Sequence, residues 1–205
     1  MSVQIKICGL TRSEDAVAAA DLGADFLGMI FIPTSPRHID GPQAAAIVGA
    51  VRKTNAKAKF VGVFRDASID VMRDTAAAVG LDLIQMHGTE TDEDIAAIGR
   101  PVIKTFRVGD ALPDTTAVTK AEWVLFDTYD ERREGGTGRR FDWSLLAMYP
   151  RTRPFLLAGG LNPGNVGAAI SLVRPDAVDV ASGVESEPGV KDHTLLKAFF
   201  ERVRR

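Results

Sequence analysis

The sequence predicts a (β/α)₈ barrel, in which eight parallel strands alternate with helices in a single domain that covers residues 1–205. Three observations favour this fold class. Short apolar runs recur eight times, and amphipathic stretches with helical periodicity separate them. Most runs are apolar at consecutive positions, as strands covered on both faces must be. The repeat of about 25 residues places the 205-residue chain at the short end of the size range for such barrels.

The eight predicted strands are evenly spaced along the chain. The first four are VQIKIC (3–8), DFLGMIFI (25–32), KFVGVF (59–64) and DLIQMH (82–87). The last four are PVIKTF (101–106), EWVLFD (122–127), PFLLAG (154–159) and AVDVAS (177–182).

Helix signals lie between these runs. Ser13 precedes EDAVAAA and Gly23 follows it, while Asn162 and Pro163 resemble a cap with a first-turn proline. The main helical candidates are residues 13–24, 41–53, 68–80, 91–99, 165–173 and 191–204. A fifth helix near 113–120 has the fewest signals, and Asp142 is a candidate cap for the sixth. A doubly wound open sheet is the alternative for the same pattern.

Composition excludes several classes of protein. Lys and Arg number 25 against 27 Asp and Glu, a formal charge of −2 that indicates neither a nucleic-acid nor a membrane-surface partner. The single cysteine cannot form an intrachain disulfide, and the first residues lack the layout of a signal peptide. No apolar run approaches the roughly 20 residues that span a bilayer. We therefore expect a soluble, cytoplasmic protein that is a monomer or a homodimer.

Chemically versatile residues end several predicted strands. Cys8 ends the first, Arg37 follows the second, His87 ends the fourth together with Gln85, Asp127 ends the sixth and Asp179 lies in the eighth. In a (β/α)₈ barrel these strand ends form the mouth that holds the active site. Taken by itself, each residue could also have a purely structural role, such as packing for a free cysteine or a turn after Asp127. Their convergence on one mouth favours a catalytic site.

Glycines after the last two strands indicate a phosphorylated ligand. The seventh strand runs into Gly159 and Gly160, and the eighth into Ser182 and Gly183. Glycines let backbone N–H groups approach an anion closely, and the loops after strands 7 and 8 often hold phosphate in this fold. EGGTG at 134–138 lacks the P-loop spacing and is read as either a closing lid or a surface turn. The three histidines are scattered, so no metal site is expected.

The order of these motifs resembles the phosphoribosylanthranilate isomerase family of tryptophan biosynthesis. The matching segments are KICGLT, GMIFIPTSPRHI, VGVF, IQMHG, LFDT, GGTGRRFDW, LAGGLNPGNV and VDVASGVESEPGVKD, which together cover nearly the full chain. The resemblance implies a cofactor-free Amadori rearrangement of N-(5-phosphoribosyl)anthranilate to 1-(2-carboxyphenylamino)-1-deoxyribulose 5-phosphate, an aldose-ketose isomerisation. One departure is Ala181, where a second serine is common in the family.

The resemblance also assigns roles to individual residues. By motif position Cys8 is the general base and Asp127 the general acid, an assignment that the residues alone do not make. A cationic intermediate or nearby basic groups are expected to lower the pKa of Cys8, and apolar neighbours to raise the pKa of Asp127. Arg37 matches the residue that pairs the anthranilate carboxylate.

The remaining matches line the mouth. Gly159, Gly160, Ser182 and Gly183 fall where the family cradles phosphate, and His87 and Asp179 fall at substrate-binding positions whose roles stay open.

Two other functions remain as alternatives. A related isomerase could act on the aminoaldose of histidine biosynthesis, although that chemistry uses a pair of aspartates in its own family. A non-catalytic sugar-phosphate-binding barrel would keep the phosphate loops but has no need for Cys8 or Asp127.

Overall fold

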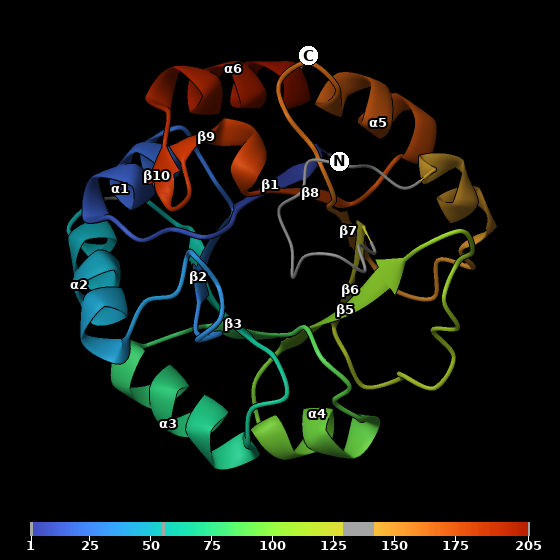
Figure 1. The fold of residues 1–205 in the computed structure, drawn as a ribbon, viewed down its shortest axis with the longest axis horizontal. Helices are drawn as coiled ribbons and strands as arrows, with labels where there is room; N and C mark the ends of the chain where they lie inside the picture. Colours follow the sequence, from blue (N-terminus) through green and yellow to red (C-terminus); the bar gives the residue numbers. More distant parts are fainter. Residues whose placement is uncertain (1, 55, 129–141, 205) are drawn as a thin grey trace.

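The computed structural model describes residues 2–54, 56–128 and 142–204 and shows a closed barrel of eight parallel strands. The strands follow chain order around the barrel, and β1 closes the ring by pairing with β8. Figure 1 shows helices surrounding the ring of strands, with α1 and α6 side by side next to the closing pair. The predicted barrel is confirmed, and the open-sheet alternative is wrong.

All eight predicted strands are present, most with slightly shorter bounds. The first four are β1 (Gln4–Ile7), β2 (Phe26–Ile30), β3 (Lys59–Phe64) and β4 (Leu83–Met86). The others are β5 (Val102–Val108), β6 (Trp123–Thr128), β7 (Phe155–Leu157) and β8 (Ala177–Val180).

The helices of the described residues form the outer layer. They are α1 (Ser13–Asp21), α2 (Gly41–Arg52), α3 (Ile69–Val79), α4 (Asp92–Ile98), α5 (Val166–Val173) and α6 (His193–Val203). Side-chain caps begin four of them, as in the capping boxes of Asp40 with Gln43 and Thr91 with Asp94. No helix within the described ranges is long and apolar enough to cross a membrane.

Two predictions about helices are wrong. Residues 113–120 form turns rather than a helix, because Asp114 accepts a hydrogen bond from the Thr116 N–H and Asp92 accepts from the N–H groups of Thr119 and Lys120. Side chains thus satisfy backbone groups that a helix would pair internally. Asn162 caps a turn and not a helix, since α5 begins only at Val166.

The sixth connection also differs from an α-helix. It is a 3₁₀ helix, η1 (Trp143–Met148), and Asp142 caps it as expected by accepting a hydrogen bond from the Ser144 N–H at 2.9 Å. Pro150 follows shortly after, where its missing N–H and fixed φ oppose continuation.

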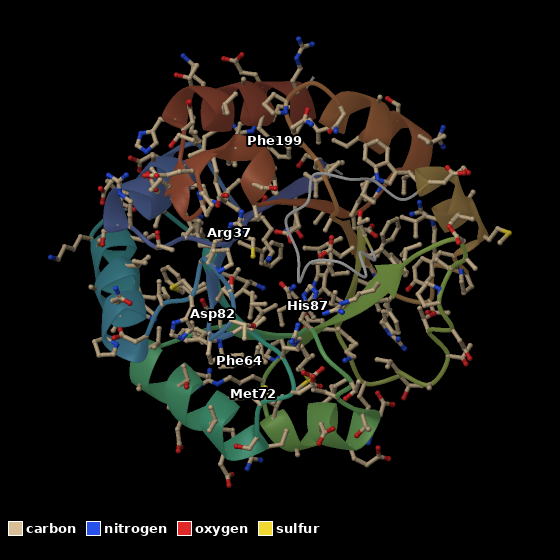
Figure 2. The ribbon with its side chains drawn as sticks, viewed as in Figure 1. Arg37, Phe64, Met72, Asp82, His87 and Phe199 are labelled. Carbon is tan, nitrogen blue, oxygen red and sulfur yellow. The ribbon has the colours of Figure 1, made fainter. Side chains whose placement is uncertain are left out.

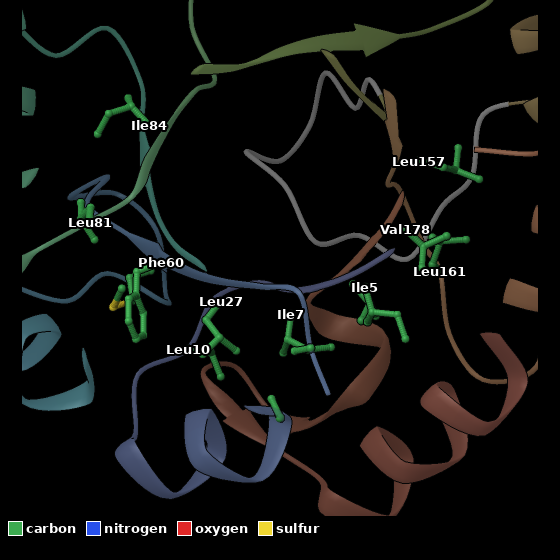
Figure 3. Packing of buried hydrophobic residues seen from close by; sticks show 14 of the residues in the cluster. Ile5, Ile7, Leu10, Leu27, Phe60, Leu81, Ile84, Leu157, Leu161 and Val178 are labelled. Carbon is green, nitrogen blue, oxygen red and sulfur yellow. The ribbon is translucent and has the colours of Figure 1, made fainter. Parts of the chain in front are cut away.

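Two apolar layers hold the barrel together. Inside the ring, one residue or two from most strands pack into a central cluster: Phe26, Val61, Leu83, Ile103, Leu125, Leu156, Ala158 and Ala177. Residues of the opposite parity point outward, as Figure 3 shows for Ile5, Ile7 and Leu27 between the strands and the surrounding helices. The central cluster fills the part of the barrel toward the amino ends of the strands. The polar positions that follow it along the strands therefore lie at the carboxyl ends.

An unpredicted hairpin follows β8. After the short 3₁₀ turn η2 (Ser182–Val184), β9 (Glu185–Glu187) pairs antiparallel with β10 (Val190–Lys191). Gly189 has φ +87° in the connecting turn, a conformation that glycine adopts without strain. The hairpin brings Glu185 and Lys191 back toward the barrel mouth.

We expect Leu196→Ala in α6 to lower the free energy of unfolding by about 2–5 kcal/mol, because it leaves a cavity under a fully buried side chain. Leu172→Ala in α5 is the matched control, since that leucine is 61% exposed and should change stability by no more than about 0.5 kcal/mol. Urea denaturation followed by circular dichroism measures both. Similar losses in the two variants would contradict the placement of α6 against the barrel.

Candidate active site

Polar side chains from the inward faces of several strands gather at the carboxyl end of the barrel. Because side chains alternate along a strand, residues two apart point the same way. The inward-facing residues at the strand ends are Lys6 in β1 with Cys8 just after it, Gln85 in β4 with His87 just after it, Thr105 and Arg107 in β5, Asp127 in β6 and Asp179 in β8. The structure therefore brings together Cys8, His87, Asp127 and Asp179 from four separate segments.

Cys8 lies at the junction of β1 and β8. Its backbone N–H donates to the carbonyl of Val180 at 2.9 Å, and the residue is only 6% exposed. Burial raises the pKa of the thiol and outweighs the opposing effect of the Lys6 ammonium. The basic groups lower this pKa as expected, but desolvation exceeds their attraction, so the net pKa of Cys8 is raised.

Lys6 and Asp179 form a buried ion pair next to this thiol. They are direct partners in the β1–β8 register, and Nζ of Lys6 lies 2.9 Å from Oδ1 of Asp179. Lys6 is fully buried and the Asp179 side chain is 10% exposed. Asp179 thus reaches the mouth as predicted, but one of its oxygens already has a partner in the protein.

Asp127 faces the mouth from the far side of the barrel. Its Oδ1 accepts a hydrogen bond from the Thr128 N–H at 2.8 Å, and Oδ2 lies 3.9 Å from Nε2 of His87. Burial raises the pKa of Asp127 to about 6, with a further contribution from the negative charge of Asp179. The raised pKa agrees with the expectation from its apolar neighbours.

His87 is held in its neutral form. Its backbone N–H donates to the carbonyl of Phe64 at 2.8 Å, which fixes the residue at the end of β4. Burial and the nearby charge of Arg107 lower the pKa of His87 to about 3. The side chain lines a cavity of about 480 Å³ over β3, β4 and β5, together with Arg65 and Arg107. A neutral imidazole there can donate one hydrogen bond and accept another.

Arg37 has a protein partner on the β8 side of the mouth. Its Nε and Nη2 donate to the two carboxylate oxygens of Glu185 at 2.7–3.1 Å, and Lys191 lies 2.8 Å from the same carboxylate. A Cβ at Gly9 would lie 2.5 Å from Cδ of Arg37, so the glycine after Cys8 makes room for this side chain. Figure 2 shows Arg37 and His87 within the ring of strands, seen down the barrel.

Lys191 connects this network to the backbone just after β1 and β8. Its buried ammonium donates to the carbonyl oxygen of Cys8 at 2.6 Å and to that of Ala181 at 3.2 Å. The ends of β1 and β8 are therefore tied to the β9–β10 hairpin.

The predicted glycine turns lie beside each other after β7 and β8. Gly159 and Gly160 have φ +86° and +70°, and a Cβ on Gly159 would collide with Thr128. A Cβ on Gly183 would collide with the carbonyl of Leu161, while Ser182 opens the 3₁₀ turn η2. Both turns need glycine, the first for its conformation and the second for close approach of two backbones.

Two further predictions concern the segment 134–138 and metal binding. The EGGTG segment at 134–138 lies outside the described residues. Within the described ranges, no group of three or more His, Cys, Asp or Glu side chains is arranged to hold a metal ion.

Four further residues of the site were not predicted from the sequence: Lys6, Arg107, Glu185 and Lys191. Lys6 and Arg107 carried a usable signal, because each lies two positions from another inward-facing residue and therefore shares its side of the strand. The pairing of Glu185 with Arg37 spans 148 positions and carried none.

Comparisons with known proteins identify the family of this chain. The sequence model of the N-(5'phosphoribosyl)anthranilate (PRA) isomerase family matches residues 5–202. An N-(5'-phosphoribosyl)anthranilate isomerase of Pseudomonas fluorescens (strain SBW25) is 45% identical over 206 aligned positions, which cover 99% of this chain and 96% of that protein.

Solved structures agree in fold over nearly the whole length. A phosphoribosyl anthranilate isomerase from Thermus thermophilus has a TM-score of 0.86 at 37% identity, with 98% of each chain covered. Another phosphoribosyl anthranilate isomerase, solved in complex with reduced 1-(o-carboxyphenylamino)-1-deoxyribulose 5-phosphate, has a TM-score of 0.82 at 37% identity and the same coverage.

We expect Asp127→Asn to remove a pH-dependent loss of stability. The pKa of Asp127 is about 6 in the folded protein against an ordinary 3.8, so the folded state binds this proton more tightly than the unfolded chain. The unfolding free energy of the wild type therefore falls as pH rises from about 4 through about 6, by roughly 3 kcal/mol from this group. Asparagine does not ionise, so the difference between variant and wild type should grow by that amount in urea denaturation. A constant difference from pH 4 to 7 would contradict the raised pKa.

Proposed function

The chain belongs to the N-(5'phosphoribosyl)anthranilate isomerase family, and from this premise we propose how its own residues perform the reaction. The protein is an isomerase of tryptophan biosynthesis that converts N-(5'-phosphoribosyl)anthranilate by an Amadori rearrangement. Cys8 is the proposed general base and Asp127 the proposed general acid. The observation that supports this pair best is the raised pKa of Asp127, which increases the protonated fraction of this carboxyl group near neutral pH.

Ring opening is the step assigned to Asp127. Its carboxyl group delivers a proton to the furanose oxygen while the bond between that oxygen and C1 breaks. The electron pair of the anthranilate nitrogen forms the C1–N double bond and leaves an iminium cation. Asp127 ends the step as a carboxylate, and the neutral imidazole of His87 beside it is suited to hydrogen bonding with ribose hydroxyls.

Removal of the C2 proton is the step assigned to Cys8. The thiolate takes this proton, and the electrons of the C–H bond form a C1–C2 double bond as the iminium nitrogen becomes neutral. The resulting enolamine ketonises when C1 gains a proton and the C2 hydroxyl loses one. The iminium cation stabilises the nearby thiolate until it takes the C2 proton.

Two different sets of residues at the mouth are assigned to the two ends of the substrate. Gly159 and Gly160 with Ser182 and Gly183 are the proposed phosphate cradle, supported by two turns that require glycine. Arg37 is the proposed partner of the anthranilate carboxylate. Among the described residues Nη1 of Arg37 has no hydrogen-bond partner, so the guanidinium can hold Glu185 and a ligand carboxylate together.

Asp179 is the remaining proposed substrate-binding residue. Its carboxylate is partly exposed at the mouth although Oδ1 pairs with Lys6. We also propose that the protein acts in the cytoplasm as a monomer or a homodimer. A crystal structure described as mutually generated monomers of the dimeric isomerase of Thermotoga maritima is among the similar structures.

We expect purified protein to consume N-(5'-phosphoribosyl)anthranilate with loss of anthranilate fluorescence, and both Cys8→Ala and Asp127→Asn to lower kcat at least about 100-fold, since removed general acid–base groups cost about that much. KM should change far less, because neither group is assigned a binding contact. Steady-state fluorescence assays give both constants.

Assays with the histidine-pathway aminoaldose separate the alternatives. Turnover of that substrate alone would favour the related isomerase, and product binding in calorimetry without turnover would favour a binding barrel. Near-wild-type kcat in both variants would contradict the assigned roles.

We expect Gly160→Ala to raise KM about tenfold or more and to weaken inhibition by inorganic phosphate, because an added side chain disturbs a backbone cradle that approaches the anion closely. Gly99→Ala is the matched control, since Gly99 has nearly the same φ, +69° against +70°, at the end of α4. Both variants carry the same conformational cost, so only the first should affect phosphate binding. Equal KM values for the two would contradict the assigned cradle.

A further inference from the structure

The floor of the mouth holds a lysine that the proposed mechanism does not use. Lys6 is 0% exposed, its ammonium lies 2.9 Å from Asp179, and the Cys8 thiol lies beside it over Gly28. Lys6 and Cys8 follow each other on the inward face of the same strand. Asp179 is the direct cross-strand neighbour of Lys6, so both partners of the ammonium are fixed by the barrel itself.

Gly28 of β2 leaves the space in which these groups meet. A Cβ at this position would lie 3.0 Å from Sγ of Cys8 and 3.2 Å from Nζ of Lys6. It would also lie 3.2 Å from Cα of Cys8, which cannot move without displacing β1. Any larger residue would therefore press on the thiol and the ammonium together.

We propose that Lys6 is a positioning residue that stabilises the thiolate of Cys8, with Asp179 holding the ammonium in place and Gly28 leaving room for it. This inference rests on the proposed role of Cys8 as the base. Lys6 has no exposed surface with which to touch the substrate, so it acts through Cys8 alone.

The charges around the thiol support this role for Lys6. The charged groups that face Cys8 are Lys6 on β1, Asp179 on β8, Lys191 on β10 and Arg37 after β2. Lys6 provides the largest effect that opposes burial, and it lowers the pKa of Cys8 more than Asp179 raises it.

Lys6 itself stays charged. Burial alone would lower its pKa, but Asp179 and Cys8 outweigh burial and raise it. The ion pair with Asp179 therefore favours the ammonium form of Lys6.

Alkylation of the thiol tests the inference directly. Cys8 is the only cysteine of the chain, so the rate of reaction with iodoacetamide as a function of pH reports its ionisation without other substitutions. We expect Lys6→Met to move the midpoint of this profile upward by about one pH unit, which slows alkylation about tenfold below the midpoint. Lys104→Met is the matched control, because Lys104 is also buried and paired, 2.7 Å from Glu90, but does not face the thiol. Its profile should match the wild type.

A second variant covers the case in which Lys6→Met does not fold with Asp179 left unpaired. Lys6→Met/Asp179→Asn removes both charges, and its midpoint should still rise because the effect of Lys6 is the larger one. In steady-state kinetics the folded variant should have a lower kcat with little change in KM. The alkaline limb of its pH profile of kcat should shift together with the midpoint of the alkylation profile. An unchanged midpoint in the folded variants would overturn the inference, even if Cys8→Ala is inactive. If Cys8→Ala is active, the proposed base is wrong, whatever the alkylation profiles show.

Discussion

The ion pair of Lys6 and Asp179 links the closing strands of the barrel to the proposed chemistry at its mouth. The two residues are 173 positions apart and meet where the last strand returns to the first. Two charges inside a barrel lose much of their hydration, so such a pair is stable only with both members present. Removal of one partner from a buried pair costs about 3–5 kcal/mol, because the other charge is left uncompensated. The pair therefore favours the register that places Cys8 at the mouth.

A second network sets the upper edge of the same site. Arg37, Glu185 and Lys191 come from segments after β2, in β9 and in β10, and they share one carboxylate. Because Lys191 also donates to the backbone carbonyl of Cys8, the hairpin is tied to the residue that carries the thiol. The planar guanidinium of Arg37 has five donors, so it can serve this network and a ligand at once.

Local patterns predicted the fold and most positions of the candidate site, whereas partners distant in sequence were invisible to them. Apolar runs located all eight strands, and strand ends located Cys8, His87, Asp127 and Asp179 at one mouth. The helix expected near 113–120 failed because Asp92, from another segment, competes for its N–H groups. The net rise in the pKa of Cys8 was not predicted for a related reason. This pKa depends on burial as well as on charged neighbours, and burial is a property of the folded barrel. The raised pKa of Asp127 could be anticipated because its apolar neighbours are adjacent in the chain.

The two pKa values together determine how the proposed acid and base share a proton. Near neutral pH Asp127, with a pKa of about 6, is largely ionised, while burial keeps Cys8 as a thiol. The proposed reaction needs the reverse arrangement, a protonated carboxyl and a thiolate. Both arrangements contain one proton, so the reactive fraction depends on the difference between the two pKa values and not on pH between them. Each pKa unit by which this difference narrows raises that fraction about tenfold. A bound substrate that excludes water raises the pKa of Asp127, and the iminium cation lowers the pKa of Cys8. In the proposed mechanism, Lys6 acts in the same direction on the thiol before any substrate arrives.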